Sequence, residues 1–134
     1  MMKLITHMVL LISVLFVATA QAEESAAASN DVVYVELKPS FVTNYQDRKM
    51  GYLKADVTLK VKGDQTAEAV DRHQPAIRHH LVMLFSSQTM EALNSMEGKE
   101  QLKETALSEV VSALQEEGEP AEVEDILFTS FIVD

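Results

Sequence analysis

The chain has 134 residues, 47% of them apolar, with a formal net charge of −10 and no cysteine. This length accommodates one domain, and the lack of cysteine excludes a disulfide framework, a thiolate nucleophile and a cysteine-ligated zinc site. The excess negative charge disfavours binding to nucleic acid, because an acidic protein is repelled by phosphate backbones.

The first 22 residues have the layout of a secretory signal peptide. A short basic start precedes the apolar run from Met8 to Ala18, and Ala20 and Ala22 supply the small residues of a cleavage site before Glu23. An uncleaved membrane anchor is the alternative, since residues 4–22 are just long enough to span a bilayer. Either interpretation places the rest of the chain across the cytoplasmic membrane.

The N-terminal part of the mature chain changes from linker to strand. Residues 23–31 are small and polar without periodicity, which predicts a flexible linker before a domain over residues 32–134. The β-branched and aromatic run from Val32 to Leu37 predicts a strand. We expect it to stop at Pro39, which has no ladder donor, and a second short strand to cover Phe41 to Tyr45.

The clearest strand in the sequence is residues 51–61. Its odd positions are apolar and its even positions are mostly polar, which predicts a half-buried antiparallel strand with one wet face. Three lysines lie on that wet face: Lys54, Lys60 and Lys62.

The next part of the chain has helical periodicity. Pro75 predicts that the first helix kinks or splits near Gln74, because proline lacks an N–H and crowds the preceding turn. A short helical turn is expected over Met90 to Leu93, after capping residues. A long helix is expected from Glu97 to Glu116, with Gly118 as its C-terminal stop.

The last segment, Val123 to Val133, carries apolar residues on both parities. This pattern predicts an interior strand covered on both faces, or an oligomer contact. The order of strands, then helices, then one strand predicts an α+β fold, in which two to three helices cover one face of a small, mostly antiparallel sheet.

No motif for catalysis or metal binding is present in the sequence. Phosphate-binding, dinucleotide-binding, serine-hydrolase and zinc-protease signatures are absent. His73, His79 and His80 have neither a carboxylate nor an imidazole four residues away, so we expect solvent-side histidines that respond to pH. We therefore predict no catalytic residue, no cofactor and no metal site.

Two charged surfaces are candidates for a subunit interface. The acidic run, from Glu116 to Asp125, includes Glu117 and Glu119, and the strand lysines Lys54, Lys60 and Lys62 have the opposite charge. Both sets are also explained as solvated faces, which contribute little to stability. If they attract one another between molecules, the contact is head-to-tail and is able to close a ring.

Six segments occur in an order and spacing that resemble the flagellar basal-body-associated protein family FliL. The resemblance covers nearly the whole chain from Val32 to Asp134, although no single segment is specific by itself. The segments are FVTN (41–44), GYLKADVTL (51–59), PAIRHHL (75–81), LFSSQT (84–89), EGKEQLK (97–103) and ILFTSFIV (126–133).

The resemblance implies a non-enzymatic accessory of the flagellar motor. Such proteins have one transmembrane helix and a periplasmic α+β domain related in shape to the stomatin/prohibitin (SPFH-like) domain, which forms rings around the stator units. The implied partners are stator and basal-body proteins and further copies of the chain, with membrane association through these partners or an N-terminal anchor. An exported stomatin-like scaffold that regulates a membrane channel or protease unrelated to motility is the alternative.

Overall fold

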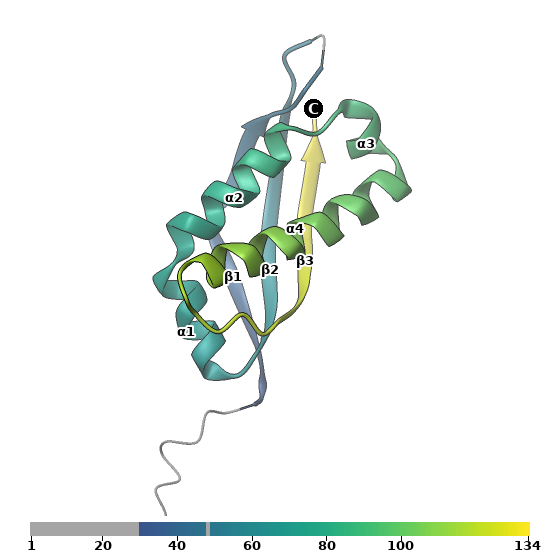
Figure 1. Cartoon of the computed structure of the whole chain (residues 1–134). Coiled ribbons are helices and arrows are strands. Elements are labelled where there is room, and N and C mark those ends of the chain that lie inside the picture. Colours follow the sequence, from purple (N-terminus) through teal and green to yellow (C-terminus); the bar gives the residue numbers. More distant parts are fainter. Residues whose placement is uncertain (1–29, 48) are drawn as a thin grey trace, which may run out of the picture.

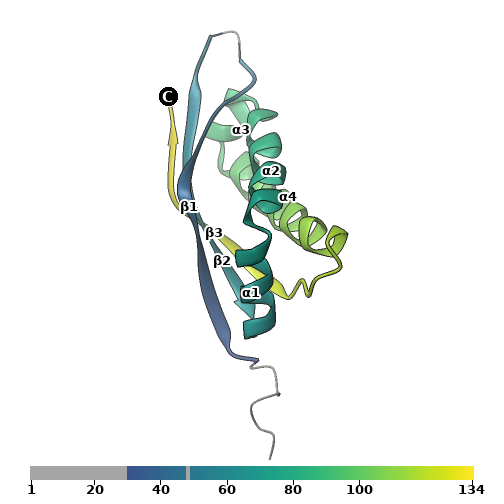
Figure 2. The same cartoon turned by 90° about the vertical axis from the view of Figure 1, so that its left-hand side faces the viewer.

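The computed structural model describes residues 30–47 and 49–134. It has an α+β architecture, as expected, with a three-stranded antiparallel sheet in the order β1-β2-β3 (Figure 1). Viewed along the sheet, the helices all lie on one face (Figure 2). Within the described ranges there are four helices, where two to three were expected. The elements in chain order are β1 (Val32–Asn44), β2 (Tyr52–Lys62), α1 (Asp64–Arg72), α2 (Gln74–Ser86), α3 (Met90–Asn94), α4 (Met96–Glu116) and β3 (Val123–Val133).

Strand β1 continues through Pro39, so the predicted division into two strands is wrong. The pairing of β1 with β2 shifts register between Leu37 and Phe41, and the Lys38–Pro39 peptide bond is cis. β1 is an edge strand of this sheet. Proline is tolerated in an edge strand or a bulge because no second neighbour needs its missing N–H.

Strand β2 is the centre of the sheet and follows its predicted alternation. The side chains of its odd positions face the helices and are fully buried, whereas its even positions are half-buried or exposed. These residues therefore form the floor of the core. The five buried positions are Leu53, Ala55, Val57, Leu59 and Val61.

Strand β3 is the other edge of the sheet, so the prediction of an interior strand covered on both faces is wrong. Register shifts leave Glu124 and Thr129 without a partner in β2. Each extra residue changes whether the odd-numbered or the even-numbered side chains of β3 face the helices. Phe128 is therefore opposite Val57 and Phe131 is opposite Ala55, although their numbers differ in parity. The bulges explain why apolar residues occur at both odd and even positions.

The helix boundaries follow local signals in the sequence. The first helical stretch is split as predicted, because α1 ends at Arg72 and Pro75 lies in the first turn of α2. Thr89 caps α3 and Ser95 caps α4, each accepting a hydrogen bond from a backbone N–H three residues on. Gly118 has a φ of 70° and lies just after α4.

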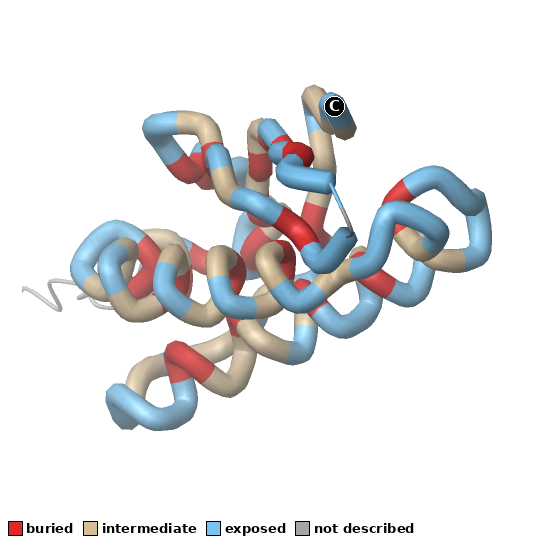
Figure 3. Tube along the Cα trace, turned by 90° about the horizontal axis from the view of Figure 1, so that it is seen from above, coloured by how far each residue is buried: buried red, intermediate tan, exposed pale blue. Residues whose placement is uncertain are grey.

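The core lies between the sheet and the helices. Leu59, Leu81 and Val110, from three different elements, are fully buried, and Phe128 is half-buried at the border of the core. Phe85 joins the two layers, since its ring makes edge-to-face contacts with Phe41 at 5.6 Å and with Phe128 at 5.9 Å. Figure 3 shows that buried and exposed positions alternate along the helices, as expected for helices with one apolar face.

Candidate functional site

The face of the sheet that points away from the helices carries the three predicted lysines. Lys54 and Lys62 are exposed and Lys60 is half-buried. No helix or strand of residues 30–47 and 49–134 covers this face, as the edge-on view shows (Figure 2). We call it the open face, and define it by Tyr34, Val42, Lys54, Lys60, Lys62 and Ile132.

Large apolar side chains lie beside the lysines on the open face. Lys54 pairs with Val42 on β1 and with Ile132 on β3, and those two side chains are 62% and 50% exposed. Tyr34, which is opposite Lys60, is 59% exposed. Exposed apolar groups next to charged ones are typical of surfaces that contact another protein.

The lysines of the open face differ in their ion pairs. The Lys60 Nζ lies 3.4 Å from Glu124 Oε2 on the adjacent strand, so its charge is partly compensated within the chain. For Lys54 and Lys62 no ion pair is found in the part of the chain that the structure describes. These two amines are therefore the cations of the open face that are available to a partner.

The acidic residues of the candidate interface are held by the junction between α1 and α2. Arg72 Nη2 donates to Glu119 Oε2 at 2.9 Å, and His73 Nε2 lies 3.0 Å from Glu119 Oε1. Glu117 is exposed and its nearest ring nitrogen, Nδ1 of His73, is 3.9 Å away. The hydrogen bonds from His73 and from Arg72 hold the pKa of Glu119 below its usual value.

The lysines and the two glutamates do not meet within one molecule. Lys54, Lys60 and Lys62 point away from the helices, whereas Glu119 is bonded to the α1–α2 junction in the helical layer. A contact between the two sets therefore requires a second copy of the chain. Of the two glutamates, Glu117 has the weaker contacts, because Glu119 already has two close partners, Arg72 and His73.

Of the three histidines that the structure describes, two have carboxylate partners that the sequence did not reveal. His80 Nδ1 lies 2.7 Å from Glu109 Oε2, and its Nε2 lies 3.3 Å from Glu116 Oε2. The hydrogen bond with Glu109 is the main cause that raises the pKa of His80, against the opposing effect of burial. His79 is exposed as expected, but His73 and His80 are half-buried, so the expectation of solvent-side histidines is wrong for these two.

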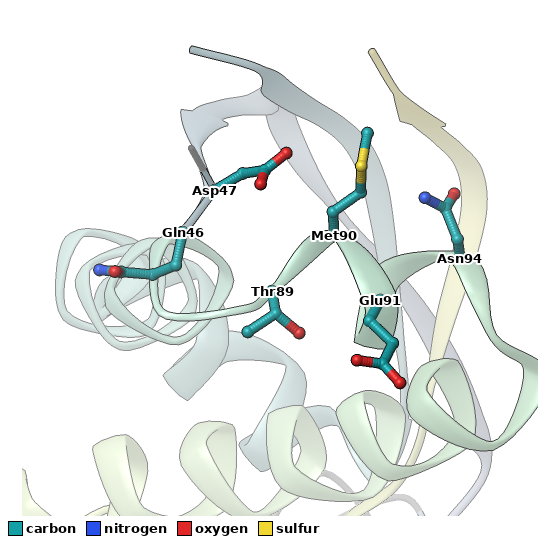
Figure 4. A pocket seen from close by; sticks show the side chains of 6 residues that line it. All are labelled: Gln46, Asp47, Thr89, Met90, Glu91 and Asn94. Atoms are coloured by element: carbon teal, nitrogen blue, oxygen red, sulfur yellow. The ribbon is translucent and has the colours of Figure 1, made fainter. Parts of the chain in front are cut away.

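An open depression lies at the end of the molecule where β1 turns toward β2. Its volume is about 750 Å³, and it is lined by Gln46, Asp47, Thr89, Met90, Glu91 and Asn94 (Figure 4). The Thr89 hydroxyl accepts a hydrogen bond from the Ala92 N–H as a helix cap. The carboxylates of Asp47 and Glu91 point in different directions (Figure 4). In the described ranges, no three His, Asp or Glu side chains are placed to hold a metal ion.

The predicted cleavage site lies outside the described residues. It comprises Ala20, Ala22 and Glu23, so cleavage stays a prediction. From residue 30 onward, with residue 48 left aside, none of the helices has the length and apolar character needed to cross a membrane.

Comparison with known proteins identifies the family. The model of the family described as "Flagellar basal body-associated protein FliL" matches residues 34–133. A protein of Aquifex aeolicus (strain VF5) named "Flagellar protein FliL" is 30% identical over 102 residues, which cover 75% of this chain and 61% of that protein. A protein of Escherichia coli (strain K12) with the same name is 35% identical over 81 residues, which cover 58% of this chain and 50% of that protein. The chain thus spans between half and two thirds of the length of these relatives. Because the family model matches most of its residues, the chain belongs to the flagellar basal body-associated FliL family.

Proposed function

We propose that the chain is a non-enzymatic accessory of the flagellar motor, which associates with the basal body and the stator units on the periplasmic side of the inner membrane. The family match over residues 34–133 supports the basal-body association, because the family description names that structure. The open face supports a binding role, since it presents apolar and cationic side chains that no described helix or strand covers.

The proposed mechanism is differential binding. A protein without catalytic groups changes a machine only by binding one of its states more tightly than another. In this proposal the chain favours the active, torque-generating state of the stator. Several copies arranged as a ring around the stator strengthen weak single contacts, because each bound copy raises the effective concentration of the next contact.

The proposed contact between copies joins the open face of one molecule to the acidic run of its neighbour. Lys54 and Lys62 are exposed and form no ion pair with a described residue. Of the two interface glutamates, Glu117 is the more exposed, and its ion pair with His73 is long, at 3.9 Å. Because the two surfaces are unlike, the contact is head-to-tail and closes into a ring when the rotation between copies allows it. The observation that carries this proposal is a face of the sheet that no described element covers, with two lysines that form no ion pair with a described residue.

A charge reversal tests the contact between copies. Lys54→Glu with Lys62→Glu leaves the Lys60–Glu124 pair intact and should weaken self-association about tenfold, as measured by sedimentation. Adding Glu117→Lys should restore part of the association, because the attraction is re-established with opposite signs. The matched control is Lys49→Glu with Lys99→Glu, which makes the same change of net charge on exposed residues away from the open face.

The control separates a local contact from a general effect of charge. If it weakens association as much as the variant of the open face, net charge explains the result and the proposed contact is wrong. Circular dichroism of each variant establishes that the monomer is folded.

A deletion strain tests the role in the motor. Cells that lack the gene should swim more slowly or fail to swim, although their filaments are assembled, and a plasmid copy should restore swimming. Normal swimming of the deletion strain under viscous load would contradict the proposed function.

A further inference from the structure

Two histidines connect the helical layer to the acidic run. His80, near the middle of α2, lies between Glu109 and Glu116 of α4, which are two helical turns apart. His73, between α1 and α2, lies next to Glu117 and Glu119 in the segment that follows α4. In each case the two ring nitrogens face two different carboxylates.

This geometry matches a protonated imidazole. A neutral histidine has one N–H and one lone pair, so it donates to one carboxylate and presents a lone pair to the other. A protonated histidine donates from both nitrogens. For His80, Nδ1 is hydrogen-bonded to Glu109 at 2.7 Å and Nε2 lies 3.3 Å from Glu116 as an ion pair, so only the charged ring presents a proton to both carboxylates.

We propose that His80 is a proton-operated clamp, which joins α2 to the C-terminal half of α4 when protonated and releases Glu116 when it loses its proton. His73 extends the contact between these helices to the following segment, because its Nε2 lies 3.0 Å from Glu119 and its Nδ1 lies 3.9 Å from Glu117. Loss of the proton therefore removes a contact that restrains the acidic run and also the positive charge beside it. This inference does not depend on the proposed function.

The charged groups around the clamp come from every neighbouring element. Glu109 and Glu116 face His80 from α4, and the His79 ring on α2 is 6.3 Å away between centroids. Around His73 the groups are Arg72 and Glu68 of α1, and Glu117 and Glu119 after α4. Four of these seven groups are glutamates that bind one of the two histidines.

The direction of the pH effect follows from the two perturbed groups. The pKa of His80 is raised above 6.5, so its contribution is complete below that pH and is lost as the pH rises through the raised pKa. The pKa of Glu119 is lowered from 4.5, so its contribution is complete above that pH and is lost only in stronger acid. The clamp is therefore closed in mildly acidic solution and opens on the alkaline side.

NMR titration of the full chain tests the first step of the proposal. The imidazole signals of His73, His79 and His80 are followed from pH 5 to 9. We expect His80 to titrate above pH 6.5, the ordinary value for a histidine, and Glu116→Gln to lower the titration point of His80. A His80 that titrates at or below pH 6.5 would overturn the clamp, because its two carboxylates would then not be stabilising the charged ring.

Backbone dynamics test the second step, the release of the acidic run. The ¹⁵N heteronuclear NOE of the Gly118 amide should fall between pH 5.5 and pH 8.5 in the wild type, and should be low at both pH values in His73→Gln with His80→Gln. His79→Gln is the matched control and should behave as the wild type, since no ion pair of His79 is found within residues 30–47 and 49–134. A Gly118 signal that is independent of pH in the wild type would overturn the proposal.

Thermal melts add a readout that does not depend on signal assignment. His80→Gln should lower the melting temperature by about 2 to 4 °C at pH 5.5 and by much less at pH 8.5. Glu116→Gln, which leaves the ring in place, should reproduce most of the effect. An equal loss at both pH values would show a structural role for His80 without a proton-operated one.

Discussion

The contact between α3 and α4 allows one substitution to be predicted in detail. A Cβ atom added at Gly98 would lie 2.1 Å from the Ala92 carbonyl oxygen and 2.7 Å from its Cα. Both are backbone atoms, so α3 would have to move by more than 1 Å to reach an ordinary contact. Gly98→Ala also removes a glycine from a helix, which by itself stabilises by about 1 kcal/mol.

We expect the overlap to exceed this gain in helix propensity. Overpacking typically costs about 1 to 3 kcal/mol net, which corresponds to a melting temperature lower by about 4 to 12 °C in a domain of this size. Ser108→Ala, at an exposed position of the same helix, is the matched control and should raise the melting temperature slightly. If Gly98→Ala raises it as well, the close approach of α3 to α4 would be wrong.

Three further predictions concern the core, the end of β3 and processing. Leu81→Ala, at a fully buried position, should lower the free energy of unfolding by about 2 to 5 kcal/mol. Phe128→Ala should lower it by less than the loss of a fully buried Phe, because its side chain is only half-buried. Equal thermal melts for wild type and Leu81→Ala would contradict the placement of α2. Tyr45→Phe should cost about 1 kcal/mol in urea unfolding, since the buried Tyr45 hydroxyl donates to the Asp134 main-chain oxygen at 3.0 Å; an unchanged midpoint would show that this bond adds nothing. The mature protein should begin at Glu23 by mass spectrometry, and an intact N-terminus in the membrane fraction would favour the anchor instead.

The features that the sequence predicted are those with local causes. The alternation of β2 has a period of two over the whole strand, so the buried and open faces followed directly from it. Pro75 lacks an N–H and allows a helix to begin but not to continue, so the division between α1 and α2 was predictable. The cap at Thr89 belongs to the same class, because its hydroxyl accepts from the Ala92 N–H, three residues on.

The features that the sequence did not predict depend on pairing between distant segments. At Glu124 and Thr129 the side chains of β3 that face the helices change between odd and even positions. Such a bulge depends on the register with β2, which no local pattern encodes. The edge position of β1 decides whether Pro39 ends a strand, and that position is a property of the whole sheet.

In the candidate site, too, the features with local causes were predicted and those that depend on contacts between distant segments were not. The lysines of the open face were found from their spacing along β2, because strand neighbours of the same parity share a face. The partners of His80 were missed, since Glu109 and Glu116 reach it only through the packing of α2 against α4. The intrachain partners of Glu119 were missed for the same reason, because Arg72 and His73 are 47 and 46 residues away in sequence.

The most direct test of the proposed role is the torque of single motors in cells whose only copy of the gene carries Lys54→Glu with Lys62→Glu. With a bead attached to the filament, we expect lower torque at high load than in the wild type, and partial recovery when Glu117→Lys is added. Lys49→Glu with Lys99→Glu should leave the torque unchanged. Full torque in the Lys54 and Lys62 variant, with the protein present at its normal level, would contradict a function of the open face in the motor.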